Sequence, residues 1–374
     1  MTNIWEGLPM KEKQNKFRGC LLGLAVGDAM GYTVDSKTLS QIYEDYGPNG
    51  LLGYDLANGC AEITSYTQLS AYCANALLLM LTHRQMRGSC APTLRYFSLA
   101  LREWARTQQY SDPEQNRCWL STVPEMKRKR CMDTWMLSTL SGETLGSLET
   151  PANLSNHPAP LTTVIPLALL WENLEGTDEA QNRLACETVA LTHGNPETFL
   201  SGAVLCHVLR KLLSEETVEI SALVHDALHA LQLQFGREYA QTVKFYELFQ
   251  HAFTLAQRDD ISAQDAMEQL GCRTAPEVLS GVLYACLTCH GDFDTAMITA
   301  VNHSGRSAAV GAITGAILGA VLGETALPEF YLESLEPTPY LRELANDMAH
   351  GCPMGAGSNL FDDDWDRKYL HAGH

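Results

Sequence analysis

The chain has 374 residues, and 45% of them are hydrophobic, which is enough for a substantial buried core. Its formal net charge of −18 repels phosphate backbones at long range and argues against nucleic acid as a general partner. Residues 1–17 contain no apolar core and the apolar runs are too short to span a bilayer, so we expect a cytoplasmic protein without a signal peptide or a membrane contact.

The predicted elements are almost all helices. Apolar residues recur at three- and four-residue spacing in several segments, as they do on the buried face of an amphipathic helix. In chain order, these segments are 69–81, 94–104, 161–171, 197–213, 220–235, 276–287 and 309–322. Runs of alternating polarity are scarce, and the pattern therefore predicts an all-α fold.

Glycine and proline concentrate in three stretches that we predict to be loops: 47–49, 150–160 and 351–357. No low-complexity linker or sharp change of composition divides the chain. We therefore expect a single helical domain over 17–350, preceded by a polar segment, 1–16, and followed by a tail, 351–374. The acidic run within that tail is interpreted as a surface segment.

Two predicted helices carry glycine at every fourth position, which places each set on one helix face. The sets are Gly19, Gly23, Gly27 and Gly31, and Gly311, Gly315, Gly319 and Gly323. Each glycine inside a helix costs about 1 kcal/mol relative to alanine. Such a cost is recovered only where another backbone approaches closely, so we predict that these two helices pack against each other.

The second of these helices follows a polar loop, and 301–320 reads VNHSGRSAAVGAITGAILGA. This segment, together with the earlier Gly-Asp-Ala-Met-Gly at 27–31, strongly resembles the ADP-ribosylglycohydrolase family, also called DraG-like. In that family the loop runs roughly N-H-D-G-D-S-D-S-T-G-A-I-T-G, and a second motif runs I-S-D-D-T-Q-M. The resemblance covers nearly the whole chain and implies a single-domain orthogonal helical bundle that cleaves ADP-ribosyl bonds with two magnesium ions.

The residues that would hold those ions differ in this chain. The acidic positions of the loop carry Ser304, Arg306 and Ala308, and the two aspartates of the earlier motif are replaced by Ser65 and Tyr66. Magnesium requires six oxygen ligands in an octahedron, and neutral hydroxyls do not supply the missing negative charge. A guanidinium adds repulsion. We therefore expect no metal ligands and no cofactor.

Arg306 admits two hypotheses. In the first, Arg306 and Tyr66 fill the volume that the metals would take, and the guanidinium pairs with Ser65, Asp28, Asp35 or backbone carbonyls. In the second, Arg306 extends into solvent.

Other positions of a cleft follow from the resemblance alone. Asp35 corresponds to a family glutamate that lies over the site, and His193 stands in a T-H-G-x-P loop near the bound ligand. Asp35 and Asp28 are the candidate acid and base. The candidate ligand-binding residues are Thr64, Ser65, Tyr66, His193, Ser304, Gly305, Arg306 and Ser307.

The remaining motifs favour ordinary structural roles. The basic run 127–130 is typical of a solvated helix end. His225 and His229 share a helix face but have no evident third ligand for a metal. Cys286 and Cys289 form a single CxxC without a second pair, so the 12 cysteines are interpreted as reduced thiols packed as small hydrophobes.

The sequence is compatible with three functions. The first is a pseudoenzyme that lacks the magnesium site and keeps a cleft for an ADP-ribose-like ligand or an ADP-ribosylated protein. The second is a hydrolase of ADP-ribosyl glycosidic bonds with reduced or no metal dependence, since two carboxylates can cleave such a bond. The third is a binding protein that acts as an immunity or regulatory partner of an ADP-ribosyltransferase.

Overall fold

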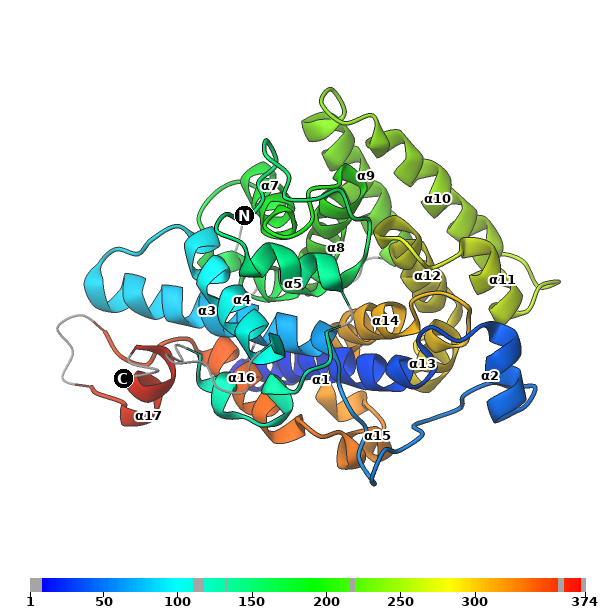
Figure 1. Ribbon diagram of the computed structural model, residues 1–374, viewed down its shortest axis with the longest axis horizontal. Coiled ribbons are helices and arrows are strands. Elements are labelled where there is room, and N and C mark those ends of the chain that lie inside the picture. Colours follow the sequence, from blue (N-terminus) through cyan, green and yellow to red (C-terminus); the bar gives the residue numbers. More distant parts are fainter. Residues whose placement is uncertain (1–8, 110–117, 132, 215–218, 356–359, 371–374) are drawn as a thin grey trace.

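The computed structural model describes residues 9–109, 118–131, 133–214, 219–355 and 360–370. Over these residues the protein is all-α, as predicted, and the only β-type pairings are two isolated bridges (Figure 1). No helix of the described part is both long and apolar enough to cross a membrane.

The helices, in chain order, have the following bounds: α1 Met10–Val34, α2 Leu39–Tyr46, α3 Ser65–Arg87, α4 Thr93–Gln109, α5 Thr134–Ser141, α6 Ile165–Leu169, α7 Asp178–Ala190, α8 Pro196–Ser214, α9 Ile220–Phe235, α10 Gln241–Ala256, α11 Ala263–Leu270, α12 Ala275–Thr288, α13 Phe293–Val301, α14 Ser307–Leu322, α15 Glu329–Ser334, α16 Thr338–His350 and α17 Asp363–Tyr369.

The centre of the bundle is the antiparallel pair α1 and α14, drawn in dark blue and gold in Figure 1. A Cβ atom on Gly27 would lie 1.9 Å from the carbonyl oxygen of Gly311, and one on Gly23 would lie 2.1 Å from that of Gly315. No side chain fits at such distances, so the predicted close packing is confirmed. Gly323 differs from its set, because it lies just beyond α14 with a φ of 78°.

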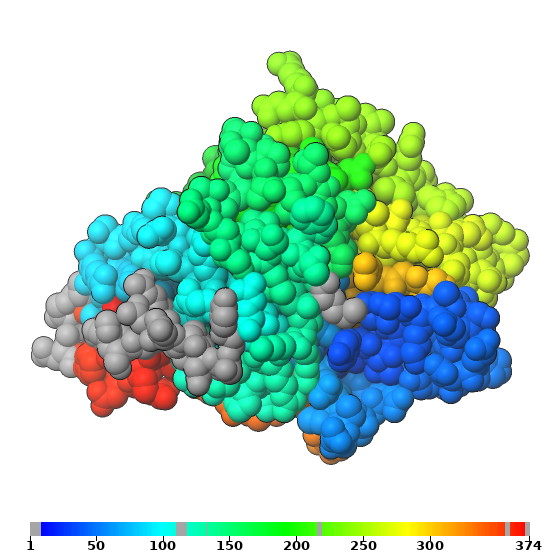
Figure 2. Space-filling view, viewed as in Figure 1, coloured from blue at the N-terminus to red at the C-terminus, as the bar shows by residue number. Residues whose placement is uncertain are grey.

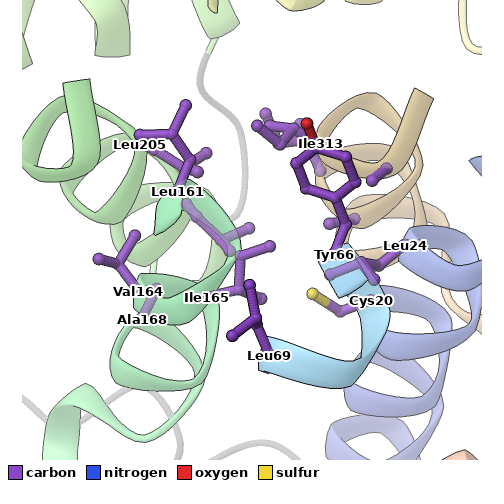
Figure 3. Close-up of a cluster of buried hydrophobic side chains, with 14 of the residues drawn as sticks. Cys20, Leu24, Tyr66, Leu69, Leu161, Val164, Ile165, Ala168, Leu205 and Ile313 are labelled. Atoms are coloured by element: carbon purple, nitrogen blue, oxygen red, sulfur yellow. The ribbon is translucent and has the colours of Figure 1, made fainter. Parts of the chain in front are cut away.

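The start of α3 is held in the hydrophobic core beside this pair (Figure 3). Tyr66 and Leu69 of α3 lie among side chains from α1, α8, α14 and the segment 159–169. Because several elements contact this first turn, its position relative to α1 and α14 is fixed.

One predicted helix differs from the observed structure. The segment 161–171 forms a 3-10 run, Ala159–Val164, and then the five-residue helix α6. Pro160 and Pro166 lack the backbone N–H groups that a continuous α-helix needs. The other predicted helices lie within α3, α4, α8, α9, α12 and α14.

The tail packs onto the domain through α17. Trp365 and Tyr369 are buried, and the Trp365 indole donates a 3.0 Å hydrogen bond to Thr82 of α3. Lys368 pairs with Asp347 of α16 at 2.7 Å. The described part of the tail therefore combines an acidic outer surface with a buried inner face.

Candidate functional site

Several helix ends meet on one side of the bundle and enclose two adjoining hollows. An inner pocket of about 20 Å³ lies where α1 ends and where α3 and α14 begin, and it is lined by Asp35, Thr64, Ser65, Tyr66 and Arg306 among others. A hollow of that size holds about one water molecule.

The second hollow, which we call the outer hollow, has a volume of about 640 Å³. Its walls include Trp135 of α5, Asn156, Arg273 and the loop residues Ser304 and Gly305. Figure 2 views the face on which the green segment containing α5 meets the yellow and orange segments around 271–306. Asp133, His157 and Arg306 line both hollows and form the boundary between them.

Asp28 lies behind the inner pocket, fully buried. Its carboxylate accepts four hydrogen bonds, from the backbone N–H groups of Thr64 and Thr67 at 2.9 and 3.1 Å and from both of their hydroxyls at 2.6 Å. Burial raises the pKa of Asp28 to about 6, although all four hydrogen bonds act in the opposite direction. Asp28 thus fixes the start of α3.

Asp35 has a similar relation to α14. Its Oδ1 accepts a 3.2 Å hydrogen bond from the backbone N–H of Ala308, and its Oδ2 lies 4.0 Å from the Arg306 guanidinium. Burial raises the pKa of Asp35 against both of these contacts. A carboxylate at a helix N-terminus is stabilised by the unpaired N–H groups and the helix dipole.

Tyr66 and Arg306 face the inner pocket from different surroundings. Tyr66 belongs to the hydrophobic core (Figure 3), and burial raises the pKa of its hydroxyl well above the ordinary value. The Arg306 side chain is 35% exposed and reaches from Asp35 to the outer hollow. Arg306 therefore neither lies wholly in the pocket nor extends freely into solvent.

The loop before α14 is held by its own hydrogen bonds. Ser304 Oγ accepts a 2.8 Å hydrogen bond from the backbone N–H of Leu39, and the N–H of Gly305 donates to His303 Nδ1 at 2.9 Å. The buried Ser307 hydroxyl donates to the carbonyl of His303 at 3.3 Å. Of these predicted ligand residues, Ser304 and Gly305 line the outer hollow, whereas Ser307 lies behind it.

Asp133 organises the wall that the start of α5 gives to both hollows, a role that the sequence did not indicate. Its Oδ1 accepts hydrogen bonds from the backbone N–H groups of Trp135 and Met136, which start α5. Its Oδ2 lies 2.8 Å from Nε2 of the fully buried His193, without the alignment of a hydrogen bond, and 3.5 Å from His157 Nδ1. Burial opposes ionisation, but the two histidines outweigh it and lower the pKa of Asp133.

His157 joins the same group from the loop before α6. Its Nδ1 accepts a 3.1 Å hydrogen bond from the backbone N–H of Ala159. Burial lowers the pKa of His157 to about 4, so the ring is neutral at physiological pH. With Nδ1 accepting, the proton of the neutral ring is assigned to Nε2.

Arg130 corrects the interpretation of the basic run as a solvated helix end. Its side chain is only 7% exposed and lines the inner pocket. It pairs with Glu62 at 2.9 Å and with Glu336, and it donates a 2.5 Å hydrogen bond to the carbonyl of Ile63. Arg128 and Lys129 are exposed, as predicted, and only Arg130 was misinterpreted, because its ion-pair partners are distant in sequence.

The described residues place no three histidine, cysteine, aspartate or glutamate side chains together as a metal site would require. His225, one of the histidine pair, stacks on the ring of Phe253 at 5.0 Å between centroids. The carboxylates nearest the inner pocket, Asp35 and Asp133, already accept backbone N–H groups at helix starts.

Fold and site together define an all-α protein with a polar cleft at one end of a glycine-packed helix pair. The chain belongs to the ADP-ribosylglycohydrolase family, whose sequence model matches residues 9–356. An uncharacterized protein of Archaeoglobus fulgidus is 24% identical over 347 residues, which cover 90% of this chain and 96% of that protein.

A solved structure described as an ADP-ribosylglycohydrolase-related protein complex is similar with a TM-score of 0.52. It is 22% identical in sequence, and the match covers 91% of this chain and 99% of that one. This likeness supports the all-α fold.

Proposed function

We propose that this protein binds an ADP-ribosyl group in the outer hollow and does not catalyse magnesium-dependent hydrolysis of the bond to it. The observation that carries the proposal is the contrast between the two hollows. The outer hollow has the volume and the cations for an anionic ligand, whereas the inner pocket has neither the space nor the free carboxylates for two metal ions.

Two arginines supply the positive charge. Arg273 has no ion pair among the described residues, and Arg306 approaches only Asp35, at 4.0 Å. Guanidinium groups match phosphate oxygens in charge and geometry. In a chain with a net charge of −18, two such groups in one hollow favour a diphosphate.

Trp135 offers a surface for a nucleotide base. It lies in the first turn of α5, lines the outer hollow and is 58% exposed. A large exposed aromatic ring beside cationic side chains suits the stacking of a planar base, and such contacts contribute about 1 kcal/mol beyond the buried area.

The inner pocket does not fit a pair of magnesium ions. The side chains at the family's metal positions include Ser65, Tyr66 and Arg306, and the aspartates nearby are engaged by helix N-termini. At ~4 Å and an effective dielectric of ~20, each unit of like charge beside a guanidinium costs about 4 kcal/mol. The proposal therefore assigns no catalytic step to a metal here.

Calorimetry with ADP-ribose tests the binding. We expect saturable binding that is equal in magnesium and in EDTA, and that weakens about tenfold or more in Arg273→Ala, because a charge-assisted hydrogen bond is worth about 1.5–3 kcal/mol. Release of ADP-ribose from ADP-ribosyl-arginine should be absent in both buffers. Magnesium-dependent turnover would overturn the proposal.

A second candidate is a metal-independent hydrolase, which one observation favours. Asp35 and Asp133 line the same pocket, and their pKa values are shifted in opposite directions. A carboxyl whose pKa is raised beside one whose pKa is lowered is the arrangement of a general acid and its partner. Turnover in EDTA that disappears in Asp35→Asn would select this candidate.

A further inference from the structure

A second groove adjoins the outer hollow, and Thr274 lines both. This groove has a volume of about 430 Å³ and lies between α10 and α12, which pack side by side (Figure 1). Its walls include Phe245, Glu247 and Glu277.

The two hollows differ in their balance of charge, since Arg273 and Arg306 outnumber Asp133 in the outer hollow, whereas glutamates outnumber Lys244 in the groove. The groove contains three glutamates, of which Glu197 is paired with Lys244 at 2.7 Å. Glu247 and Glu277 have no ion pair within the described parts of the chain, and the backbone N–H groups of Arg273 and Thr274 hold Glu277 in place at 3.0 Å each. A mainly cationic hollow therefore adjoins a mainly anionic groove at Thr274.

The groove is also lined by apolar side chains. Phe245 and Pro276 are buried, and Leu248 is half-buried. Lysine and arginine place their methylene stems along apolar surface and keep the charged end in water near a carboxylate. Apolar lining beside carboxylates that have no ion pair among the described residues suits these two side chains better than it suits a small inorganic cation.

We propose that this groove receives a lysine- or arginine-rich segment of polypeptide whose ADP-ribosyl group occupies the outer hollow. This inference rests on the proposed function and adds a second subsite with a preference of its own, for lysine or arginine beside the modified residue. Such a ligand has an anionic diphosphate beside a cationic peptide, which matches the order of charges along the two hollows.

The test uses the full chain and short synthetic peptides. One peptide carries an ADP-ribosylated serine flanked by lysines, a second has glutamates in place of the lysines, and a third is the lysine peptide without ADP-ribose. We expect the modified lysine peptide to bind about tenfold more tightly than the modified glutamate peptide at low salt. The difference should vanish near 1 M NaCl, where the Debye length is about 3 Å.

Glu247→Lys separates the groove from the outer hollow. It should weaken binding of the modified lysine peptide about threefold to fivefold, the upper part of the range for one exposed charge pair, and leave the dissociation constant of ADP-ribose unchanged. Glu329→Lys on α15 makes the same charge change on an exposed glutamate outside the groove and should alter neither.

Equal affinity for the lysine and glutamate peptides, or an equal effect of the two glutamate variants, would overturn the inference while leaving ADP-ribose binding intact. Failure of free ADP-ribose to bind, with Glu247-dependent binding of the unmodified lysine peptide, would instead overturn the proposed function and support the groove.

Discussion

The α1–α14 interface and the inner pocket lie next to each other, yet the sequence constrains them in different ways. At the interface, backbone approaches backbone, so only glycine fits at the contact positions. At the pocket, the same two helices position polar side chains around a hollow, and close approach of two backbones does not restrict the residue type there. The comparison teaches that the residues that fix the scaffold of this protein are not the residues that set the chemistry of its pocket.

The interface should be the more sensitive region. We expect Gly27→Leu to abolish the native fold or to cost more than about 4 kcal/mol, because even its Cβ would lie 1.9 Å from the Gly311 carbonyl oxygen. Urea unfolding followed by circular dichroism measures the loss. Gly53→Ala is the matched control, since a Cβ there meets no atom within 4 Å, and it should change stability by less than about 0.5 kcal/mol.

The inner pocket should accept additional carboxylates without loss of the fold, and these carboxylates should give it the ability to bind magnesium. We expect a variant that combines Ser65→Asp, Tyr66→Asp, Ser304→Asp, Arg306→Asp and Ala308→Asp to bind magnesium with a dissociation constant below about 1 mM, or about 4 kcal/mol of binding free energy. Calorimetry with magnesium chloride measures this affinity. The parent chain should show no saturable binding, and equal behaviour of the two would contradict the electrostatic argument.

Asp28 connects the two regions, since it extends from α1 to the start of α3. Its folded pKa of about 6 lies above the ordinary value of 3.8, so the folded state binds the proton more tightly. The stability contributed by this group is therefore present below about pH 4 and lost as the pH rises through about 6, a change of about 3 kcal/mol.

Comparison of the chain with Asp28→Asn measures this contribution. The free energy of unfolding should fall more steeply between pH 4 and 6 in the parent chain than in the variant. Identical slopes would show that burial does not perturb Asp28 as described.

Ser304 should have the smallest effect of the residues considered. Ser304→Ala removes the acceptor for the backbone N–H of Leu39, which costs about 1 kcal/mol. The urea midpoint should decrease slightly, and hydrogen exchange at the Leu39 amide should become faster. An unchanged exchange rate would show that this serine does not hold α2 against the loop.

The sequence predicted the parts of the molecule that depend on local pattern. The helical periodicity placed α3, α4, α8, α9, α12 and α14, and the spacing of the glycines predicted the contact between α1 and α14. Proline was the local signal that was underestimated, because Pro160 and Pro166 change 161–171 from one helix into two short segments.

The site was predicted only where a motif carries it. Asp35, Thr64, Ser65, Tyr66 and Arg306 do line one pocket. The rest of the cleft is assembled from segments that carry no local signature.

Trp135 and Arg273 show why those residues were missed. Both line the outer hollow although 138 positions separate them along the chain. Arg130 was assigned to solvent because nothing near it in sequence indicates Glu336 as its partner.

Arg130 and Glu336 together hold the backbone at Ile63, just before α3. The backbone N–H of Ile63 donates to Glu336 and its carbonyl accepts from Arg130, so both polar groups of this residue are satisfied by side chains of the chain itself. Unlike a bound metal ion, the charge of an arginine side chain is covalently part of the protein, so neither dilution nor a chelator removes it. The turn that leads into α3 should thus keep its shape across the whole range of divalent-ion concentrations found in living cells.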